Sequence, residues 1–251
     1  MTRFLTATAL AATLACAGPA LATDLTEMTD AERDAFGAAV RAYLMENPQV
    51  IIEAVNELER RQQAAQGDRD LDLIAANRGD IFDDGFSHVG GNPEGDVTLV
   101  EFIDYRCGYC RKAHEEVKEL IESDGNIRFI VKEFPILGPD SLESSKFAIA
   151  VLEVAGDAAY ESAHDALIKL GGTVNETALR RLAETLGLDA EAVLAEMESD
   201  RVAQRIAETR ALAQRLQING TPTFVLEDSL LRGYLPLDAM RQVVAQERAE
   251  G

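Results

Sequence analysis

Cysteine is scarce in this sequence, and so are histidine, tryptophan and positive charge. The 251 residues include three cysteines, three histidines and no tryptophan. Lysine and arginine number 24 against 44 acidic residues, which gives a formal net charge of −20 at pH 7. Such an acidic chain repels nucleic acid and anionic lipid, so binding of either through a basic surface is excluded. The hydrophobic share of 47% and the charged share of 27% are typical of a globular protein.

Long apolar runs are also lacking outside the N-terminal segment. Elsewhere no run reaches the roughly 18 residues of a membrane-spanning helix. At the N-terminus, Arg3 supplies a positive charge, residues 4–15 are apolar or small, and Ala20-Leu21-Ala22 fits the small-x-small rule for cleavage. We predict a signal peptide over residues 1–22, cut before Thr23, and therefore a periplasmic or otherwise exported protein.

Two alternatives stay open for this N-terminal segment. It could be a buried helix, or the leader of a lipoprotein cut before Cys16, although Thr13 stands where such a signal wants a large aliphatic residue. Cleavage after residue 22 removes one basic residue and no acid, so 23 basic and 44 acidic residues remain and the net charge becomes −21. It also removes Cys16, which leaves two cysteines in the mature chain.

The two remaining cysteines, Cys107 and Cys110, are predicted to be chemically reactive. An exported protein works where thiols can oxidise. A structural disulfide between them is the plain alternative, but a bond closing a four-residue loop contributes little to stability, because loop-closure entropy grows with loop length. We therefore interpret Cys107-Gly108-Tyr109-Cys110 as a redox pair that forms and breaks a disulfide.

A metal site or a haem attachment site is the alternative for the same segment. His114 follows Cys110 by four residues and would share its helix face, but zinc normally takes four ligands, and His88 and His164 stand isolated in the sequence. Attachment of c-type haem needs histidine directly after the second cysteine, where this chain has Arg111. We therefore expect neither a metal nor a cofactor, and we interpret His114 as a solvated helix residue.

An N-terminal helical arm is predicted over residues 23–66. Thr29 and Glu32 have the spacing of a capping box, and Asn47-Pro48 predicts the end of one helix and the N-cap of the next. Apolar residues at helical spacing form a stripe along the arm: Phe36, Ala39, Val40, Tyr43, Leu44, Val50, Ile51, Ala54, Val55 and Leu58. So thin an arm cannot bury this stripe alone, and it needs either its own domain or a second chain to cover it.

The rest of the chain, residues 67–251, has the pattern of an α/β domain. The run 97–103 is almost continuously apolar or β-branched, as in a central strand buried on both faces. Residues 67–92 form a mixed segment, and glycine-rich residues 90–95 are interpreted as a turn. The other expected elements are a helix over 107–121, a strand over 127–134, a helical block over about 140–217, strands over 223–226 and 230–234, and a helix over 237–247.

The junction between strand 97–103 and the following helix suits thiol chemistry. A helix N-terminus favours the thiolate, which is the attacking species, so we expect Cys107 to lie there with an exposed sulfur. With Arg106 and Arg111 nearby, its pKa should lie well below the roughly 8.5 of a free cysteine. Cys110, one turn later and more covered, would resolve the mixed disulfide that Cys107 forms with a substrate.

Two segments resemble the DsbA-like thioredoxin-fold family. They are the run Glu101-Phe102-Ile103-Asp104-Tyr105-Arg106-Cys107-Gly108-Tyr109-Cys110 and the run Ile218-Asn219-Gly220-Thr221-Pro222-Thr223-Phe224. Within the family the chain looks most like ScsC- and Com1-type proteins, whose N-terminal arm carries a segment similar to Tyr43-Leu44-Met45-Glu46-Asn47-Pro48-Gln49-Val50. The resemblance covers residues 30–248. One departure is Gly108-Tyr109 between the cysteines, where the strongly oxidising archetype has Pro-His, so an equally oxidising potential is not carried over.

The resemblance implies a thioredoxin fold with a helical insertion and roles for three further residues. Pro222 matches the family's cis-proline, which would present the backbone of Thr221 to a client peptide. Glu101 falls where the family places a buried acid, which could relay protons to Cys110 because burial raises its pKa. The alternative for Glu101 is a surface position on an edge strand.

The implied activity is protein thiol–disulfide exchange on unfolded or misfolded exported proteins, with a membrane redox partner that resets the cysteine pair. The arm and the likeness to ScsC-type proteins favour a homo-oligomer, with a trimer preferred, and a disulfide isomerase. The alternatives are a monomeric dithiol oxidase, and a non-catalytic binding or metal-tolerance module with an idle cysteine pair.

Overall fold

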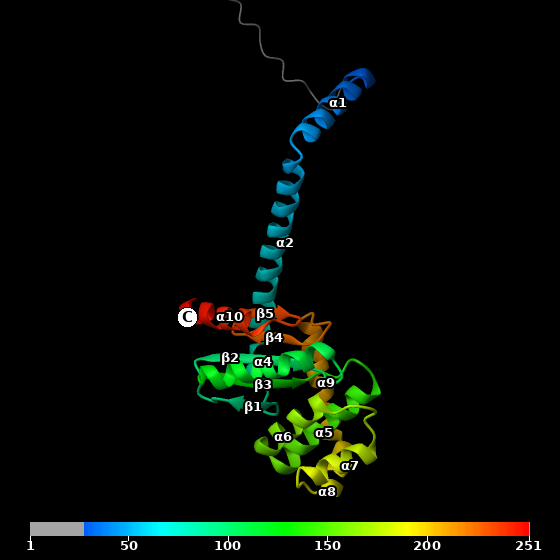
Figure 1. Ribbon diagram of the computed structural model, residues 1–251, viewed down its shortest axis with the longest axis vertical. Helices are drawn as coiled ribbons and strands as arrows, with labels where there is room; N and C mark the ends of the chain where they lie inside the picture. Colours follow the sequence, from blue (N-terminus) through cyan, green and yellow to red (C-terminus); the bar gives the residue numbers. More distant parts are fainter. Residues whose placement is uncertain (1–27, 251) are drawn as a thin grey trace, which may run out of the picture. The chain divides into compact units, whose positions relative to one another are not determined.

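The computed structural model describes residues 28–250 (Figure 1). The predicted signal peptide and Cys16 lie outside the described residues. The chain divides into two compact units, the first ending at Glu59 and the second beginning at Arg60. In the range 28–250 no helix is both long enough and apolar enough to cross a membrane.

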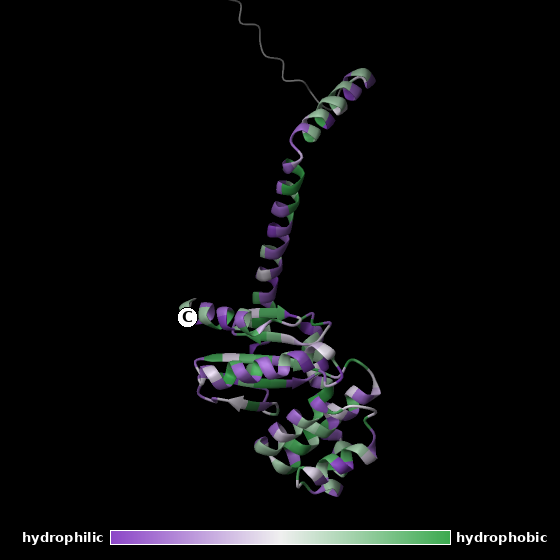
Figure 2. Ribbon diagram, viewed as in Figure 1, coloured by the Kyte–Doolittle hydropathy of each residue, from purple (hydrophilic) through white to green (hydrophobic). Residues whose placement is uncertain are grey.

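Two helices begin the described chain, α1 (Asp30–Glu46) and α2 (Gln49–Ala76). The predicted capping box at the start of α1 is confirmed, since the Glu32 N–H donates to the Thr29 hydroxyl and the Thr29 N–H donates to the Glu32 carboxylate. Asn47 was expected to cap α2, and this was wrong: its side chain donates to the Tyr43 carbonyl at 3.0 Å and so caps the end of α1. None of the residues of α1 is buried, and apolar and polar residues alternate along both helices (Figure 2).

Helix α2 runs ten residues beyond the predicted end of the arm at residue 66. Gly67 lies inside it, although glycine in a helix costs roughly 1 kcal/mol relative to alanine. Tertiary contacts offset this cost, because Ile74 is buried in the core and Asp70 accepts two hydrogen bonds, of 2.6 and 2.9 Å, from Arg232. Local sequence alone does not contain this information.

A five-stranded mixed sheet forms the centre of the second unit, with the strand order β1-β3-β2-β4-β5. The strands are β1 (His88–Gly91), β2 (Val97–Ile103), β3 (Ile127–Glu133), β4 (Thr223–Leu226) and β5 (Ser229–Arg232). Strands β2 and β3 are parallel and are joined through α4 (Gly108–Asp124), whereas the other neighbours pair antiparallel. The predicted α/β class is confirmed, and β2 occupies the middle of the sheet.

Alternation along β2 sends its side chains to two separate cores. Leu99 and Ile103 pack in the core that α4 covers, together with residues of α10 (Leu237–Glu250). Val100 and Phe102 face the opposite core, which α3 (Arg78–Phe82) and α9 (Asp200–Arg215) cover. Glu101 shares the face of Leu99 and Ile103, and this face is the one beneath the cysteine-bearing helix.

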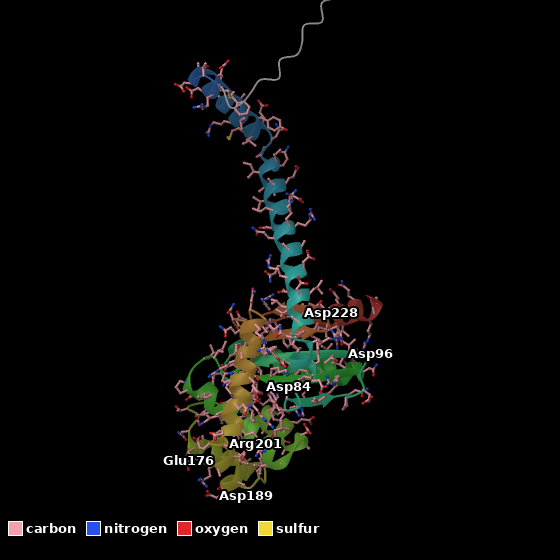
Figure 3. The ribbon with its side chains drawn as sticks, turned by 180° about the vertical axis from the view of Figure 1, so that it is seen from behind. Asp84, Asp96, Glu176, Asp189, Arg201 and Asp228 are labelled. Atoms are coloured by element: carbon pink, nitrogen blue, oxygen red, sulfur yellow. The ribbon has the colours of Figure 1, made fainter. Side chains whose placement is uncertain are left out.

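Between β3 and β4 lies the helical insertion, whose expected range of about 140–217 agrees with the observed helices. They are α5 (Pro139–Ala155), α6 (Asp157–Lys169), α7 (Glu176–Thr185), α8 (Ala190–Met197) and α9. Glu176 begins α7 and Asp189 caps α8, and both lie at the end of the block away from the sheet (Figure 3). Helix α6 returns to contact α4 and β1, so the insertion helps to build the space beneath α4.

Strand β1 contains Gly90 and Gly91, which were expected to form a turn. They pair instead with Phe129 and Arg128 of β3. Gly91 has a φ of +66°, and a Cβ there would come within 2.4 Å of the Ile127 carbonyl oxygen. Gly91 is therefore required because the neighbouring backbone approaches closely, and a glycine-rich sequence alone does not distinguish this requirement from a turn.

Replacing Gly91 by alanine should destabilise the protein by about 1–3 kcal/mol, because a left-handed φ and a backbone overlap are both imposed on the new Cβ. The matched control is Gly67→Ala, where nothing lies within 4 Å of the added Cβ and the helix should gain up to about 1 kcal/mol. Urea unfolding of both variants measures the difference. Equal midpoints for the two variants would contradict the role assigned to Gly91.

Candidate active site

The turn between β2 and α4 is held by Asp104, a buried residue that the sequence analysis did not single out. Its carboxylate accepts hydrogen bonds from the N–H of Arg106 at 2.8 Å and from the N–H groups of Ile136 and Leu137 at 2.8 and 3.0 Å. Its carbonyl accepts from the Cys107 N–H. Asp104 thus ties the segment before the cysteines to the segment that follows β3, and it fixes where α4 begins.

Arg106 and Arg111 reinforce the same junction rather than contacting the thiols. Arg111 donates to the carbonyls of Tyr105 and Leu170, both at 3.0 Å. Arg106 donates to the carbonyls of Leu170 and Gly172. The two guanidinium groups therefore bind the loop after α6 to the start of α4, and the expectation that they lower the thiol pKa is replaced by a structural role.

Cys107 is the N-cap residue of α4, as predicted, and Cys110 lies one turn later with no exposed surface. Both are free thiols. Cys107 is only 7% exposed, so the expectation of an exposed sulfur was wrong. Cys107 Sγ lies 3.1 Å from the carbonyl oxygen of Thr221, which covers it from the side of β4.

The two thiols differ sharply in acidity. The pKa of Cys107 is lowered to about 5, chiefly because the Cys110 thiol donates a hydrogen bond to its sulfur; the Thr221 side chain and the N–H groups of Cys110 and Tyr109 act in the same direction, while burial opposes them. The pKa of Cys110 is raised, first by this same hydrogen bond, which it loses on ionising, and then by burial. At neutral pH, Cys107 is a thiolate and Cys110 keeps its proton.

The peptide bond between Thr221 and Pro222 is cis, as the resemblance implied. It lies directly before β4, where Thr223 pairs with Phe102 of β2. Thr221 is half-buried, and its carbonyl oxygen faces the reactive sulfur. The site is therefore built from two segments more than 100 residues apart in sequence.

Glu101 lies on the central strand, opposite Val131 of β3 and Phe224 of β4, and only 2% of it is exposed. This excludes the alternative of a surface position on an edge strand. The pKa of Glu101 is raised to about 8, first by burial and then by the negative charges of Cys107 and Glu133. Its Oε1 atom is buried and has no hydrogen-bond partner among the described residues.

A cavity of about 380 Å³ lies beside Glu101, and sequence reasoning missed it. We name it the histidine cavity because its lining includes His88, His114 and His164, together with Glu101, Tyr160 and Asp165. The two histidines interpreted as isolated and the one interpreted as solvated are therefore brought together, and each is at most 7% exposed. Within residues 28–250, no group of three or more histidine, cysteine or acidic side chains has the arrangement of a metal site.

Next to the histidine cavity lies a second buried carboxyl, Glu133. Tyr105 and Tyr160 each donate a hydrogen bond to it at 2.7 Å, and burial raises its pKa to about 7. The Tyr105 hydroxyl is also 3.0 Å from Nδ1 of His164. One sequence signal could have indicated this cluster: Glu133 shares the alternation of Phe129 and Val131 on β3, so it points to the same core as Glu101.

The rim of the site carries an aromatic surface beside Cys107. Tyr109 is 64% exposed, and its ring centroid lies 6.3 Å from that of Tyr234 in a stacked arrangement. The ammonium of Lys112 lies 4.1 Å from the centroid of the Tyr234 ring, and the Tyr234 hydroxyl donates to Glu116. An exposed apolar ring at this position offers contact area to a bound peptide.

Comparison with known families agrees with this geometry. Residues 98–245, more than half of the chain, match the DSBA-like thioredoxin domain family. Residues 32–65 match the N-terminal domain of the copper resistance protein ScsC. The resemblance that the two sequence segments indicated is thereby confirmed, for the domain and for the type of N-terminal region.

Solved structures of similar proteins cover most of the chain. A thioredoxin-like oxidoreductase from Silicibacter pomeroyi DSS-3 is 43% identical, with a TM-score of 0.65 over 69% of this chain and 98% of that one. BcfH from Salmonella enterica Typhimurium is 27% identical, with a TM-score of 0.71 over 86% of this chain and 96% of that one.

Among curated proteins, the Na(+)/H(+) antiporter NhaA 1 of Salinispora arenicola is 33% identical over 158 residues, which are 62% of this chain and 24% of the antiporter. The chain therefore spans about a quarter of the length of the curated antiporters that it matches.

The difference between the two thiols predicts the behaviour of Cys110 variants. Ultraviolet thiolate absorbance of the reduced wild-type protein should show Cys107 ionising near pH 5. Cys110→Ala removes the main hydrogen-bond donor and should raise the pKa of Cys107, whereas Cys110→Ser keeps a hydroxyl donor and should raise it less. An unchanged Cys107 pKa in Cys110→Ala would refute this cause, and the lowered pKa would then be attributed to the helix N-terminus.

Proposed function

This chain belongs to the DSBA-like thioredoxin domain family, and we propose that it is an exported thiol–disulfide oxidoreductase that exchanges disulfides with protein clients through Cys107 and Cys110. The observation that carries the proposal is the unequal sharing of one proton between the two sulfurs, which leaves a nucleophilic thiolate beside a buried thiol. Export follows from the predicted signal peptide over residues 1–22 and the small-x-small site before Thr23.

The exchange proceeds in two balanced steps. The Cys107 thiolate attacks one sulfur of a client disulfide, forms a mixed disulfide and releases the other client sulfur as a thiolate. Cys110 then loses its proton and attacks Cys107 Sγ, which forms the Cys107–Cys110 disulfide and releases the second client thiolate. The client gains two electrons and the cysteine pair loses two. The reverse sequence donates a disulfide to a client dithiol.

Thr221 and Pro222 are assigned to client binding in this proposal. The thiol of Cys107 donates to the Thr221 carbonyl, so ionisation of Cys107 releases that carbonyl to accept a hydrogen bond from a client N–H. An extended peptide pairing there would place its own disulfide beside Cys107. The exposed ring of Tyr109 would cover an apolar client side chain on the other side of the sulfur.

Glu101 is assigned as the base that takes the proton of Cys110 when Cys110 attacks. Its pKa of about 8 suits this task, since a base that works near neutral pH must be able both to accept and to release the proton. The negative charge of Glu101 also raises the pKa of Cys110, as expected of two groups close together in a buried environment.

The N-terminal helices support self-association in the proposal. Eight large apolar side chains of the first unit are between 41% and 70% exposed: Phe36, Val40, Tyr43, Met45, Ile51, Ile52, Val55 and Leu58. Covering each of them would contribute roughly 1.5–3 kcal/mol. We propose a homo-oligomer, with a trimer favoured, and disulfide isomerisation as the activity, since several sites facing one misfolded client raise the effective concentration of thiols.

A membrane redox partner would reset the cysteine pair.

One observation favours a second candidate, a monomeric dithiol oxidase. The lowered pKa of Cys107 stabilises the reduced pair, and a stabilised dithiol makes the corresponding disulfide a stronger oxidant. A third possibility, a binding or metal-tolerance module with an idle cysteine pair, makes no use of the difference in acidity between the thiols.

An insulin-reduction assay separates the enzyme from the idle module. Cys107→Ser should abolish turnover, because no other thiol of the mature chain is ionised at neutral pH. Cys110→Ser should still attack but accumulate the mixed disulfide, which non-reducing electrophoresis detects. Turnover that survives in Cys107→Ser would remove the enzyme assignment.

Light scattering and rescue of scrambled ribonuclease test the oligomer and the isomerase together. Val55→Glu places a charge in the apolar stripe and should yield monomers that lose rescue but keep dithiol oxidation. Asn56→Glu adds the same charge about 100° around the helix and should behave as wild type. A monomeric wild-type mass at micromolar concentration would leave the oxidase as the better assignment.

A further inference from the structure

Glu101 is buried and needs a route to solvent, because a base that takes a proton from Cys110 must later release that proton to solvent. Only 2% of Glu101 is exposed, and β3 and β4 flank its strand on both sides. The side chain faces the core beneath α4, where its Oε1 atom has no partner among the described residues. A buried carboxyl oxygen without a hydrogen-bond partner lowers the stability of the fold, so its presence indicates a functional role for Glu101.

The histidine cavity reaches this carboxyl. Its volume of about 380 Å³ far exceeds the roughly 30 Å³ that one water occupies in the liquid, and its walls offer several polar groups. The cavity is polar and large enough to hold a chain of waters, which an apolar void of the same size would not.

His114 is the residue of α4 that connects the cavity to the cysteines. It follows Cys110 by four residues and therefore lies on the same helix face, one turn further on. Its buried Nε2 lies at ion-pair distance, 3.0 Å, from the Asp165 carboxylate of α6, without the geometry of a hydrogen bond, and Asp165 pairs in turn with the exposed Lys118. Glu101, His114 and Asp165 all line this one cavity, which therefore joins the buried carboxyl to a surface ion pair.

The other charged groups around the cavity are poorly suited to this task. Burial lowers the pKa of His164 to about 3, which keeps it neutral, and its Nδ1 contacts Tyr105. Both nitrogens of His88 face acids of α6, with Asp157 at 2.8 Å and Glu161 at 3.6 Å. Glu122 and Lys118 also line the cavity. Burial lowers the pKa of His114 as well, but Asp165 and Glu115 oppose the shift.

We propose that the histidine cavity is the proton route of the exchange reaction, and that His114, oriented by Asp165, carries the proton between Glu101 and solvent. The inference rests on the proposed function. In the resolving step the Cys110 proton passes to the Glu101 carboxylate as Cys110 bonds to Cys107 and the client thiolate leaves. The Glu101 proton then passes to His114 and out past Asp165, which restores the carboxylate. His114 is a positioning residue, since it acts through Glu101 and does not touch the client.

Stopped-flow reaction of the reduced mature chain with Ellman's reagent tests the route. Attack by Cys107 releases the first thionitrobenzoate, and attack by Cys110 on the resulting mixed disulfide releases the second. The first phase should be the same in wild type and His114→Ala. The second phase should be about a hundredfold slower in His114→Ala, at the low end of what general acid–base groups contribute. The wild-type rate of that phase should rise with pH through about 8, where Glu101 becomes the carboxylate.

Chemical rescue separates proton transfer from a structural effect. Imidazole added at constant pH and ionic strength should restore the second phase of His114→Ala in proportion to its concentration and leave wild type unchanged. Asp165→Asn should also slow the second phase without altering the first, and it carries the test if His114→Ala does not fold. Glu161→Gln, which changes another acid lining the cavity, is the matched control and should react as wild type.

The outcomes distinguish this inference from the proposed function. Two phases in wild type, with an unchanged second phase in both His114→Ala and Asp165→Asn, would overturn the proton route alone. A slow second phase that imidazole does not accelerate would also overturn it, because it would indicate a structural role for His114. Absence of any Cys107-dependent phase in wild type would instead overturn the proposed function.

Discussion

The hydrogen bond from the Cys110 thiol to the Cys107 sulfur is the contact on which the site depends. It lowers the pKa of Cys107 and raises that of Cys110. The proton therefore stays on Cys110, and the Cys107 sulfur is ionised. The fold supplies the geometry: Cys107 is the N-cap of α4 and Cys110 lies one turn inward. Asp104 fixes the start of that helix through bonds to the segment after β3.

Two buried carboxyls on neighbouring strands differ in their hydrogen bonding. Oε1 of Glu133 accepts hydrogen bonds from two tyrosine hydroxyls, although its Oε2 has no partner among the described residues, and Oε1 of Glu101 has none either. Both carboxyls lie in the core beneath α4, so that core contains hydrogen-bond donors, but none of them reaches Oε1 of Glu101. An unpartnered oxygen beside a polar cavity is costly for stability and useful for proton exchange.

Local pattern predicted the parts of this structure that depend on local forces. The apolar run of β2, the capping box at Thr29 and the placement of Cys107 at a helix start follow from periodicity and residue type. Long-range packing decided the rest. The continuation of α2 past Gly67 depends on Ile74 and on the bond to Arg232, and the meeting of three histidines depends on how α6 returns to α4. Neither leaves a signal within a window of neighbouring residues.

The source of the low thiol pKa also bears on the direction of exchange. Gly108-Tyr109 places no cation beside the thiolate, and both nearby arginines are bonded to carbonyls. The main stabilising donor is the Cys110 thiol, and its contribution acts only while both sulfurs are reduced and disappears when the Cys107–Cys110 bond forms. A cation would stabilise the thiolate whatever the state of Cys110, including when Cys107 is a leaving group. The redox balance of this pair therefore rests chiefly on one hydrogen bond between its two members, with further stabilisation of the thiolate by the Thr221 side chain and the N–H groups of Cys110 and Tyr109.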